Sequence, residues 1–179
     1  MRRKFTAFLA AALALLLSAC SGDGGQLEEL RESLDQGSSV TVTAEVTALE
    51  EGRAGTYTLE LVRDTESLAV TVLEPETLAG VKAVYDGETR SLEFDGLVLD
   101  MGEAQISPID ALPRLLDALE EGYETLSWPE GDDVFISLEV SDGFTATVRL
   151  DSAGKPVWAE LLVDGVSAVQ CDISQFSIN

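Results

Sequence analysis

The sequence contains no histidine and only two cysteines among its 179 residues. Without histidine the chain lacks the most common general base, the histidine-activated serine and cysteine nucleophiles, and the main ligand of most zinc sites. Cys171 lies in an apolar, strand-like segment, which favours a buried structural thiol over a reactive one. We therefore expect a protein that is not an enzyme and that has no cofactor and no metal site.

Basic residues are also scarce, with 11 Lys and Arg against 33 Asp and Glu. This acidity excludes nucleic acid as a partner, because such binding depends on basic side chains that neutralise phosphates. It also predicts repulsion from an anionic bilayer. Solubility is the simplest role for the charge, and a cationic partner or calcium is the alternative. The adjacent acidic pairs do not have the spacing of an EF-hand loop: Glu50-Glu51, Glu120-Glu121 and Asp132-Asp133.

No apolar run is long enough to span a membrane, which takes about 18 residues or more. The longest, residues 5–17, is apolar except for Thr6 and follows the basic cluster Arg2-Arg3-Lys4. A basic start, a short apolar core and small residues at its end are typical of a secretory signal peptide. An uncleaved anchor, or a secreted protein with a chance cysteine, are the alternatives.

The end of this segment, Leu17-Ser18-Ala19-Cys20, resembles the lipobox of bacterial lipoproteins. The resemblance implies cleavage before Cys20 and attachment of lipid, such as palmitate, to that cysteine. Cys171 would then have no partner for a disulfide. We expect residues 1–19 to be a signal peptide, residues 20–25 a flexible tether, and residues 26–179 one domain. The mature protein would be an extracytoplasmic monomer held on the bacterial cell membrane by the lipid on Cys20.

Two segments of the domain have helical periodicity. In residues 26–36, Leu27, Leu30 and Leu34 share one helical face, and Gly37 follows as a C-terminal cap. In residues 107–122, Ser107 is expected as the N-cap and Pro108 as the first helical residue. Proline is unfavourable inside a helix, so Pro113 predicts a kink or two short helices.

Seven segments alternate between apolar and polar residues: 40–48, 57–61, 68–72, 81–85, 134–140, 144–150 and 157–163. Alternation indicates strands of an antiparallel sheet with one buried face. Asp-Gly pairs at 86–87, 95–96, 142–143 and 164–165 predict tight hairpins, and residues 151–156 a longer turn. The predicted fold class is mainly β (α+β). It has a single curved antiparallel sheet that forms an incomplete barrel, covered by short amphipathic helices.

Three segments resemble the outer-membrane lipoprotein carrier (LolA-like) family: VTVLEPETLAGVKAVYDGETRSLEFDGLVLDM (70–101), SPIDALPRLLDAL (107–119) and VRLDSAGKPVWAELLVDG (148–165). In that family the concave side of an incomplete barrel binds acyl chains beneath a helical roof. The resemblance implies a ligand cavity lined by Val42, Val46, Tyr57, Leu59, Val70, Val72, Leu97 and Leu99. It implies a roof of Leu112, Leu115, Leu116 and Leu119. Each of these residues could equally be ordinary core.

These patterns favour a membrane-anchored protein that binds a lipid or the acyl chains of a lipoprotein. A lipid anchor is unlike the soluble carriers, which shuttle between membranes, so a holder or acceptor at one membrane fits better. The alternative is a ligand-free interaction or sensing module that regulates an envelope protein. Its basis is Phe135, Trp158 and Leu162, which the alternation places on the face opposite the core. A hydrolase with two carboxylates is a third alternative.

Overall fold

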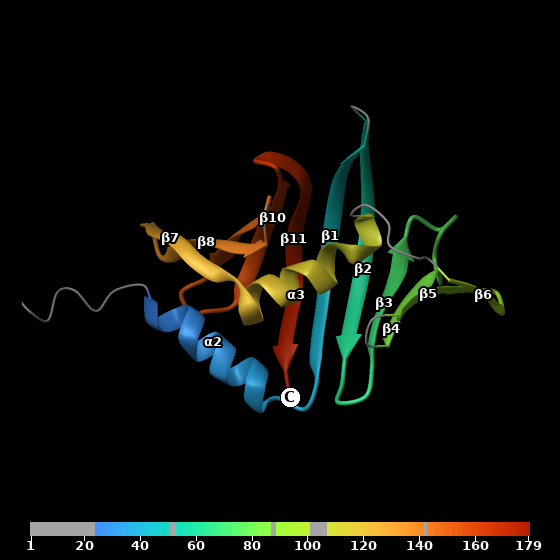
Figure 1. The fold of residues 1–179 in the computed structure, drawn as a ribbon, viewed down its shortest axis with the longest axis horizontal. Coiled ribbons are helices and arrows are strands. Elements are labelled where there is room, and N and C mark those ends of the chain that lie inside the picture. Colours follow the sequence, from blue (N-terminus) through green and yellow to red (C-terminus); the bar gives the residue numbers. More distant parts are fainter. Residues whose placement is uncertain (1–23, 51–52, 87–88, 101–106, 142) are drawn as a thin grey trace, which may run out of the picture.

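The computed structural model describes residues 24–50, 53–86, 89–100, 107–141 and 143–179. Its main element is a single antiparallel sheet (Figure 1). The strands are β1 (Val40–Glu50), β2 (Arg53–Arg63), β3 (Leu68–Glu74), β4 (Lys82–Asp86), β5 (Thr89–Phe94), β6 (Leu97–Asp100), β7 (Tyr123–Glu130), β8 (Asp133–Ser141), β9 (Phe144–Leu150), β10 (Pro156–Val163) and β11 (Val166–Ile178). The helical elements are α2 (Gly24–Gln36), the 3₁₀ turn η2 (Pro108–Asp110) and α3 (Ala111–Glu121).

The strand order is β6-β5-β4-β3-β2-β1-β11-β10-β9-β8-β7. Strands that follow one another in the chain are therefore neighbours in the sheet, except for β6 and β7. The segment through η2 and α3 crosses from edge strand β6 to edge strand β7, and β11 returns to pair with β1. Because β6 and β7 are the two ends of this order, the sheet does not close. The predicted fold class, a mainly β incomplete barrel, is confirmed.

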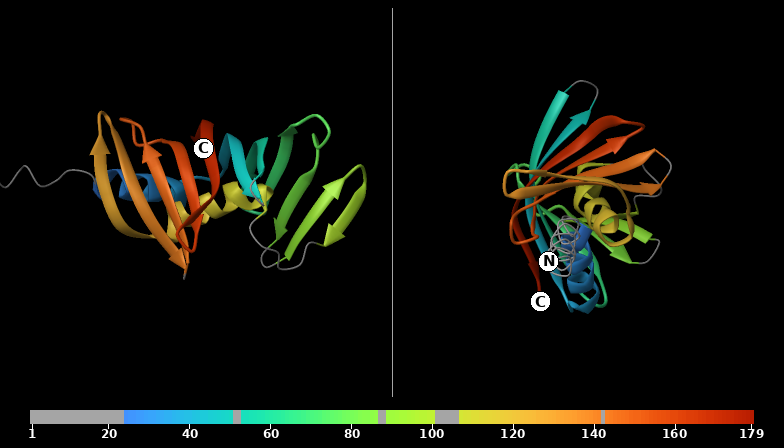
Figure 2. Two further views of the ribbon diagram at one scale, coloured as in Figure 1. Left: turned by 90° about the horizontal axis from the view of Figure 1, so that it is seen from above. Right: turned by 90° about the vertical axis from the view of Figure 1, so that its left-hand side faces the viewer.

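The sheet curves, and both helices lie on its concave side (Figure 2). Register shifts interrupt several strand pairs, for example between Thr43 and Ala44 and between Leu161 and Leu162. Such bulges increase the local twist and bend a strand. The buried residues of α2, α3 and the inward-facing strand positions form one hydrophobic core.

The turns follow the Asp-Gly signals where the structure describes both residues. Asp95 and Gly96 have φ values of 49° and 79°, and Asp164 and Gly165 have 51° and 76°. Both pairs have the positive φ values that a type I′ hairpin turn needs. The predicted hairpins between β5 and β6 and between β10 and β11 are confirmed.

Helix α2 begins at Gly24, two residues earlier than predicted, so the end of the predicted tether is helical. Leu27, Leu30 and Leu34 are buried as expected. Gly37 follows the helix but does not have a positive φ. A Cβ there would lie 2.3 Å from the Ile178 side chain, so the position needs glycine for close packing and not for a left-handed cap.

The second helical segment divides into η2 and α3, as predicted, but the break is not at Pro113. It falls after Asp110, which makes Pro113 the third residue of α3. The first amides of a helix have no partner within it, so proline costs little there. No described helix has the length and hydrophobicity of a membrane span.

Candidate ligand-binding pocket

An open apolar pocket of about 280 Å³ lies between η2 and the strands of the first half of the sheet. Its floor comes from β2 and β3, its side from β5 and the turn before β4, and its cover from η2. The lining residues are Tyr57, Leu59, Val72, Leu78, Val81, Leu92, Ser107, Pro108 and Ile109. Only Tyr57 and Ser107 bring polar side chains. The pocket therefore suits a hydrocarbon group better than a charged ligand.

Three of the predicted cavity residues line this pocket: Tyr57, Leu59 and Val72. Val42, Val46 and Val70 are buried in the core and are not part of its lining. Leu97 is 67% exposed and lies away from the pocket, because the hairpin turn at Asp95 and Gly96 carries it to the edge of the sheet. The side chain of Leu99, like Cys20, lies outside the described residues.

The predicted roof residues are packed in the hydrophobic core and do not cover an open cavity. Leu112, Leu115, Leu116 and Leu119 are each at most 2% exposed and belong to the core. Ala111, Pro113 and Ala118 are buried too, so α3 is enclosed on most of its surface. This helix fills the concave side, and the open apolar volume lies beside its N-terminal end.

A polar cluster holds η2 against the sheet. The Asp110 carboxylate is paired with the Arg90 guanidinium of β5, and it accepts a hydrogen bond of 2.7 Å from the Tyr85 hydroxyl of β4. The Ser107 amide donates to the same carboxylate over 3.1 Å. Burial, reinforced by Asp110, raises the pKa of the Tyr85 hydroxyl, so tyrosine stays a neutral donor. The cluster fixes the cover of the pocket to its wall.

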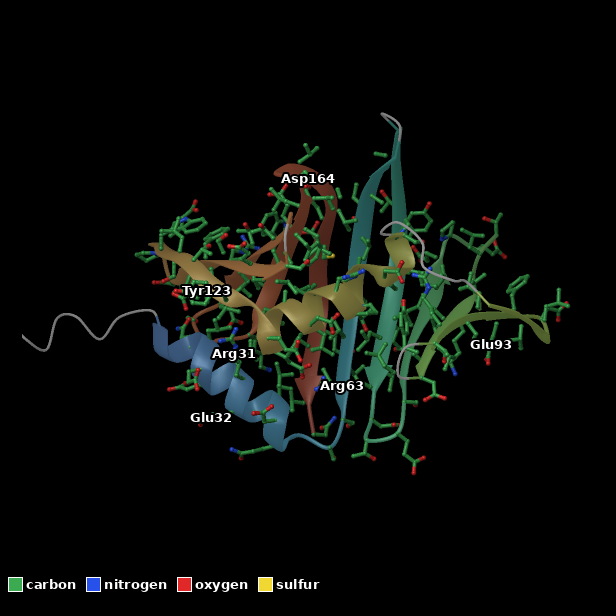
Figure 3. All side chains as sticks on the ribbon, viewed as in Figure 1. Arg31, Glu32, Arg63, Glu93, Tyr123 and Asp164 are labelled. Atoms are coloured by element: carbon green, nitrogen blue, oxygen red, sulfur yellow. The ribbon has the colours of Figure 1, made fainter. Side chains whose placement is uncertain are left out.

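The other end of α3 is attached to α2 by Arg31. Its guanidinium Nε donates to the Leu119 carbonyl over 2.8 Å, and Nη2 donates to the Gly122 carbonyl. Figure 3 shows Arg31 projecting from α2 towards this end of α3. The last carbonyls of a helix lack partners within the helix and carry partial negative charge, so an arginine stabilises them. Arg63 pairs with Glu120 and ties the same helix to β2.

A second groove, of about 410 Å³, lies beside α2. It is larger than the apolar pocket, but much of its lining is polar: Gln26, Glu29, Ser33, Lys155 and Ser177, together with Leu30, Ala153, Gly154, Phe176 and Ile178. An acyl chain bound in this groove would bury polar side chains without giving them hydrogen-bond partners, and this cost would offset the free energy gained from burying the chain. We therefore take the pocket at η2 as the candidate site.

Sequence reasoning missed five of the apolar lining residues: Leu78, Val81, Leu92, Pro108 and Ile109. Periodicity predicts that Val81, Leu92 and Ile109 face the inside of the domain. It does not predict whether an inward-facing residue packs in the core or lines the pocket. Leu78 lies in the turn between β3 and β4, outside any alternating pattern. Its role depends on the path of that turn.

Two other kinds of chemistry, metal binding and a reactive thiol, find little support among the described residues. The described residues contain no cluster of acidic, cysteine and histidine side chains suited to a metal ion. Cys171 is a buried free thiol, and burial together with the charge of Asp172 raises its pKa to about 12. A thiol with such a pKa stays protonated and unreactive at neutral pH.

The chain is similar in fold to several solved structures. An uncharacterized conserved protein from Thermus thermophilus has 13% sequence identity over 88% of both chains, with a TM-score of 0.52. A LolA superfamily protein from Nitrosomonas europaea has 12% identity over 87% of this chain and 92% of that chain, with a TM-score of 0.46. The Mycobacterium tuberculosis lipoprotein LppX has 16% identity over 87% and 96%, with a TM-score of 0.43.

No protein-family model matches the chain, and a search of curated proteins gives no match. At these identities the likenesses concern the fold alone. The open antiparallel sheet of this chain, with helices on its concave side, is the arrangement that the family resemblance implied.

Proposed function

We propose that this protein is an extracytoplasmic, lipid-anchored binding protein that holds an acyl chain of a lipid or lipoprotein in the apolar pocket at η2. The pocket supports this proposal most directly, because it is the apolar opening beside a concave face that α3 otherwise fills. Its volume is near the lower end of ligand sites, which run from about 300 to 1,000 Å³. One acyl chain fits this size better than a whole phospholipid.

The anchor is supported by the sequence before the domain. A basic start, a short apolar run and the lipobox-like residues up to Cys20 indicate a lipoprotein. Only a few residues separate Cys20 from the first turn of α2 at Gly24. A domain attached so closely would stay near the membrane surface, where acyl chains are available.

The role that we propose is binding and not catalysis. The pocket lining brings one hydroxyl from Tyr57 and one from Ser107, and its other side chains are apolar. Hydrolysis by acid–base chemistry needs a suitably placed acid and base, as in the pair of carboxylates of a glycosidase. The buried Asp110 is engaged by Arg90, Tyr85 and the Ser107 amide.

Native mass spectrometry tests the proposal. The chain from Gly22 onward would be incubated with palmitate and, separately, with a diacyl phospholipid. We expect discrete palmitate adducts that are lost on denaturation. A Leu92→Trp variant fills the pocket and should abolish them, since Leu92 is a half-buried lining residue. The matched control is Ala153→Trp in the groove beside α2, which should leave the adducts unchanged.

The outcome that contradicts the proposal is equally specific. A protein that stays at its bare mass with both lipids does not hold an acyl chain. Adducts that survive Leu92→Trp but disappear with Ala153→Trp would place the ligand beside α2 and not at η2.

A further inference from the structure

Three aromatic side chains form a row on the outer, convex face of the sheet, opposite the pocket. We call Trp128 of β7, Phe135 of β8 and Trp158 of β10 the aromatic stripe. The rings of Trp128 and Phe135 stack with centroids 5.4 Å apart, and those of Phe135 and Trp158 are 6.2 Å apart and tilted. All three are half-buried. Their neighbours Val134, Ile136 and Ala159 point into the core, which places the stripe on the outer face.

A single arginine lies within the stripe. Arg149 of β9 is opposite Phe135 on one side and opposite Trp158 on the other. Its side chain is 38% exposed, and its nearest carboxylate is Asp133 at 3.7 Å. Leu126 extends the apolar surface along edge strand β7 and is 59% exposed. Aromatic residues and arginine are the types enriched at the energetic centres of protein interfaces.

Carboxylates frame the stripe. Asp172 of β11 is opposite Trp158, and Glu160 follows Trp158 on the same face. Asp133 precedes Phe135 on its face and is opposite Glu130 of β7.

Acidic residues also outnumber basic ones throughout this part of the chain. Across residues 107–179 the sequence has 14 Asp and Glu and only three Lys and Arg, which are Arg114, Arg149 and Lys155. Arg114 lies over the Phe144 ring of the core, and Lys155 lines the groove beside α2.

We infer that the aromatic stripe is a docking surface for a protein segment rich in lysine and arginine. Cationic side chains are attracted to the faces of tryptophan rings and to the surrounding carboxylates. The negative charge around the stripe also argues against a second copy of the chain or a membrane as the partner. A second copy would bring an equally acidic face, and an anionic bilayer would repel this one. The stripe is on the opposite face from the pocket, so this inference stands apart from the proposed acyl binding.

The protein carries its own reporter of this contact, because its only two tryptophans are Trp128 and Trp158. The full chain, purified in neutral detergent, would be titrated with an arginine-rich peptide while tryptophan emission is recorded. We expect a saturable change in emission that weakens as salt is added. A glutamate-rich peptide of equal length should give no change.

Matched variants locate the contact. Glu160→Gln combined with Asp172→Asn removes two carboxylates beside the stripe and should weaken peptide binding by about tenfold, because two partly exposed ion pairs are lost together. Glu60→Gln combined with Glu93→Gln removes the same charge from β2 and β5 and should have little effect. Circular dichroism would confirm that both variants fold.

Three results would overturn the inference. One is tryptophan emission that does not respond to the arginine-rich peptide. Another is an equal loss of affinity in both charge variants, which would mean non-specific attraction to an acidic protein. The third is an emission change with anionic vesicles or with increasing protein concentration, but not with the peptide. That pattern would assign the stripe to a membrane or to a second copy.

Discussion

The two ends of the sheet follow the same alternating sequence pattern but have different packing. In the covered half, β7 to β11 curve around α3 and α2, and every second residue of β9 is buried (Figure 2). In the open half, β3 to β6 extend past the helices. Among the described side chains of β4 to β6, only Ala83 is fully buried, while Phe94, Leu97 and Val98 are exposed. Alternation thus predicts which residues face inward, and helical cover decides whether those positions become core or pocket.

Matched leucine truncations test this comparison with the largest expected effect. Leu119→Ala removes a fully buried side chain from the covered half and should lower the free energy of unfolding by about 3–5 kcal/mol. Leu92→Ala in the open half removes a half-buried side chain and should cost about 1 kcal/mol. Urea denaturation measures both. Equal losses would mean that the two halves are packed alike.

The polar cluster at η2 attaches the open half of the sheet to the helical segment. Asp110→Ala leaves the Arg90 guanidinium, only 14% exposed, without its carboxylate and should destabilise the protein by about 3 kcal/mol. The matched change is Asp133→Ala, whose pair with Arg149 is partly exposed and should be worth less than about 1 kcal/mol. A larger loss in Asp133→Ala would reverse the proposed ranking.

The covered half depends in addition on the contact between its two helices. Arg31→Met keeps much of the aliphatic stem but removes the hydrogen bonds to the Leu119 and Gly122 carbonyls. We expect a loss of about 2 kcal/mol, because hydrogen bonds from charged donors are among the stronger ones. Hydrogen exchange should become faster at the end of α3. Glu32→Gln, on the exposed side of α2, serves as the control, and a comparable effect there would contradict the assigned role.

The smallest expected effect concerns Cys171 at the centre of the sheet. Its folded pKa of about 12 exceeds the ordinary value of 9.0, because the thiolate is disfavoured by burial. The unfolded thiol therefore loses its proton first as the pH rises. Any stability that this group contributes is intact below pH 9 and is lost between pH 9 and pH 12.

Iodoacetamide labelling at neutral pH measures the protection of this thiol. Cys171 should react slowly in the folded protein and rapidly in urea. Equal rates in the two conditions would show that the centre of the sheet is open to solvent.

Much of the fold could be predicted from local features of the sequence. The alternating runs predicted β1 to β4 and β8 to β10, and the Asp-Gly pairs at 95–96 and 164–165 predicted hairpins with the required positive φ. Both helical segments were also found. The pairing of β1 with β11 could not be derived this way, because it joins residues at opposite ends of the domain. The predicted break in the helix at Pro113 was wrong in position. The break falls after Asp110, where the chain passes from η2 into α3.

The candidate site was predicted only in part, for a physical reason. Tyr57, Leu59 and Val72 were found because they are inward residues of strands, but Val42, Val46 and Val70 satisfy the same rule and are packed in the core. The difference arises from where α3 lies across the concave face. Arg31 and Asp110 fix that position through contacts with distant carbonyls and side chains, and nothing in their local sequence reveals those partners.

The most direct test of the central claim is hydrogen exchange of the backbone amides with and without palmitate. We expect slower exchange around the pocket, at Ser107 to Asp110, in the turn between β3 and β4, and in β5. Exchange in α2 and at residues 153–155 should be unchanged. Protection confined to α2 and residues 153–155, or no protection anywhere in the chain, would contradict the claim that the open half holds an acyl chain.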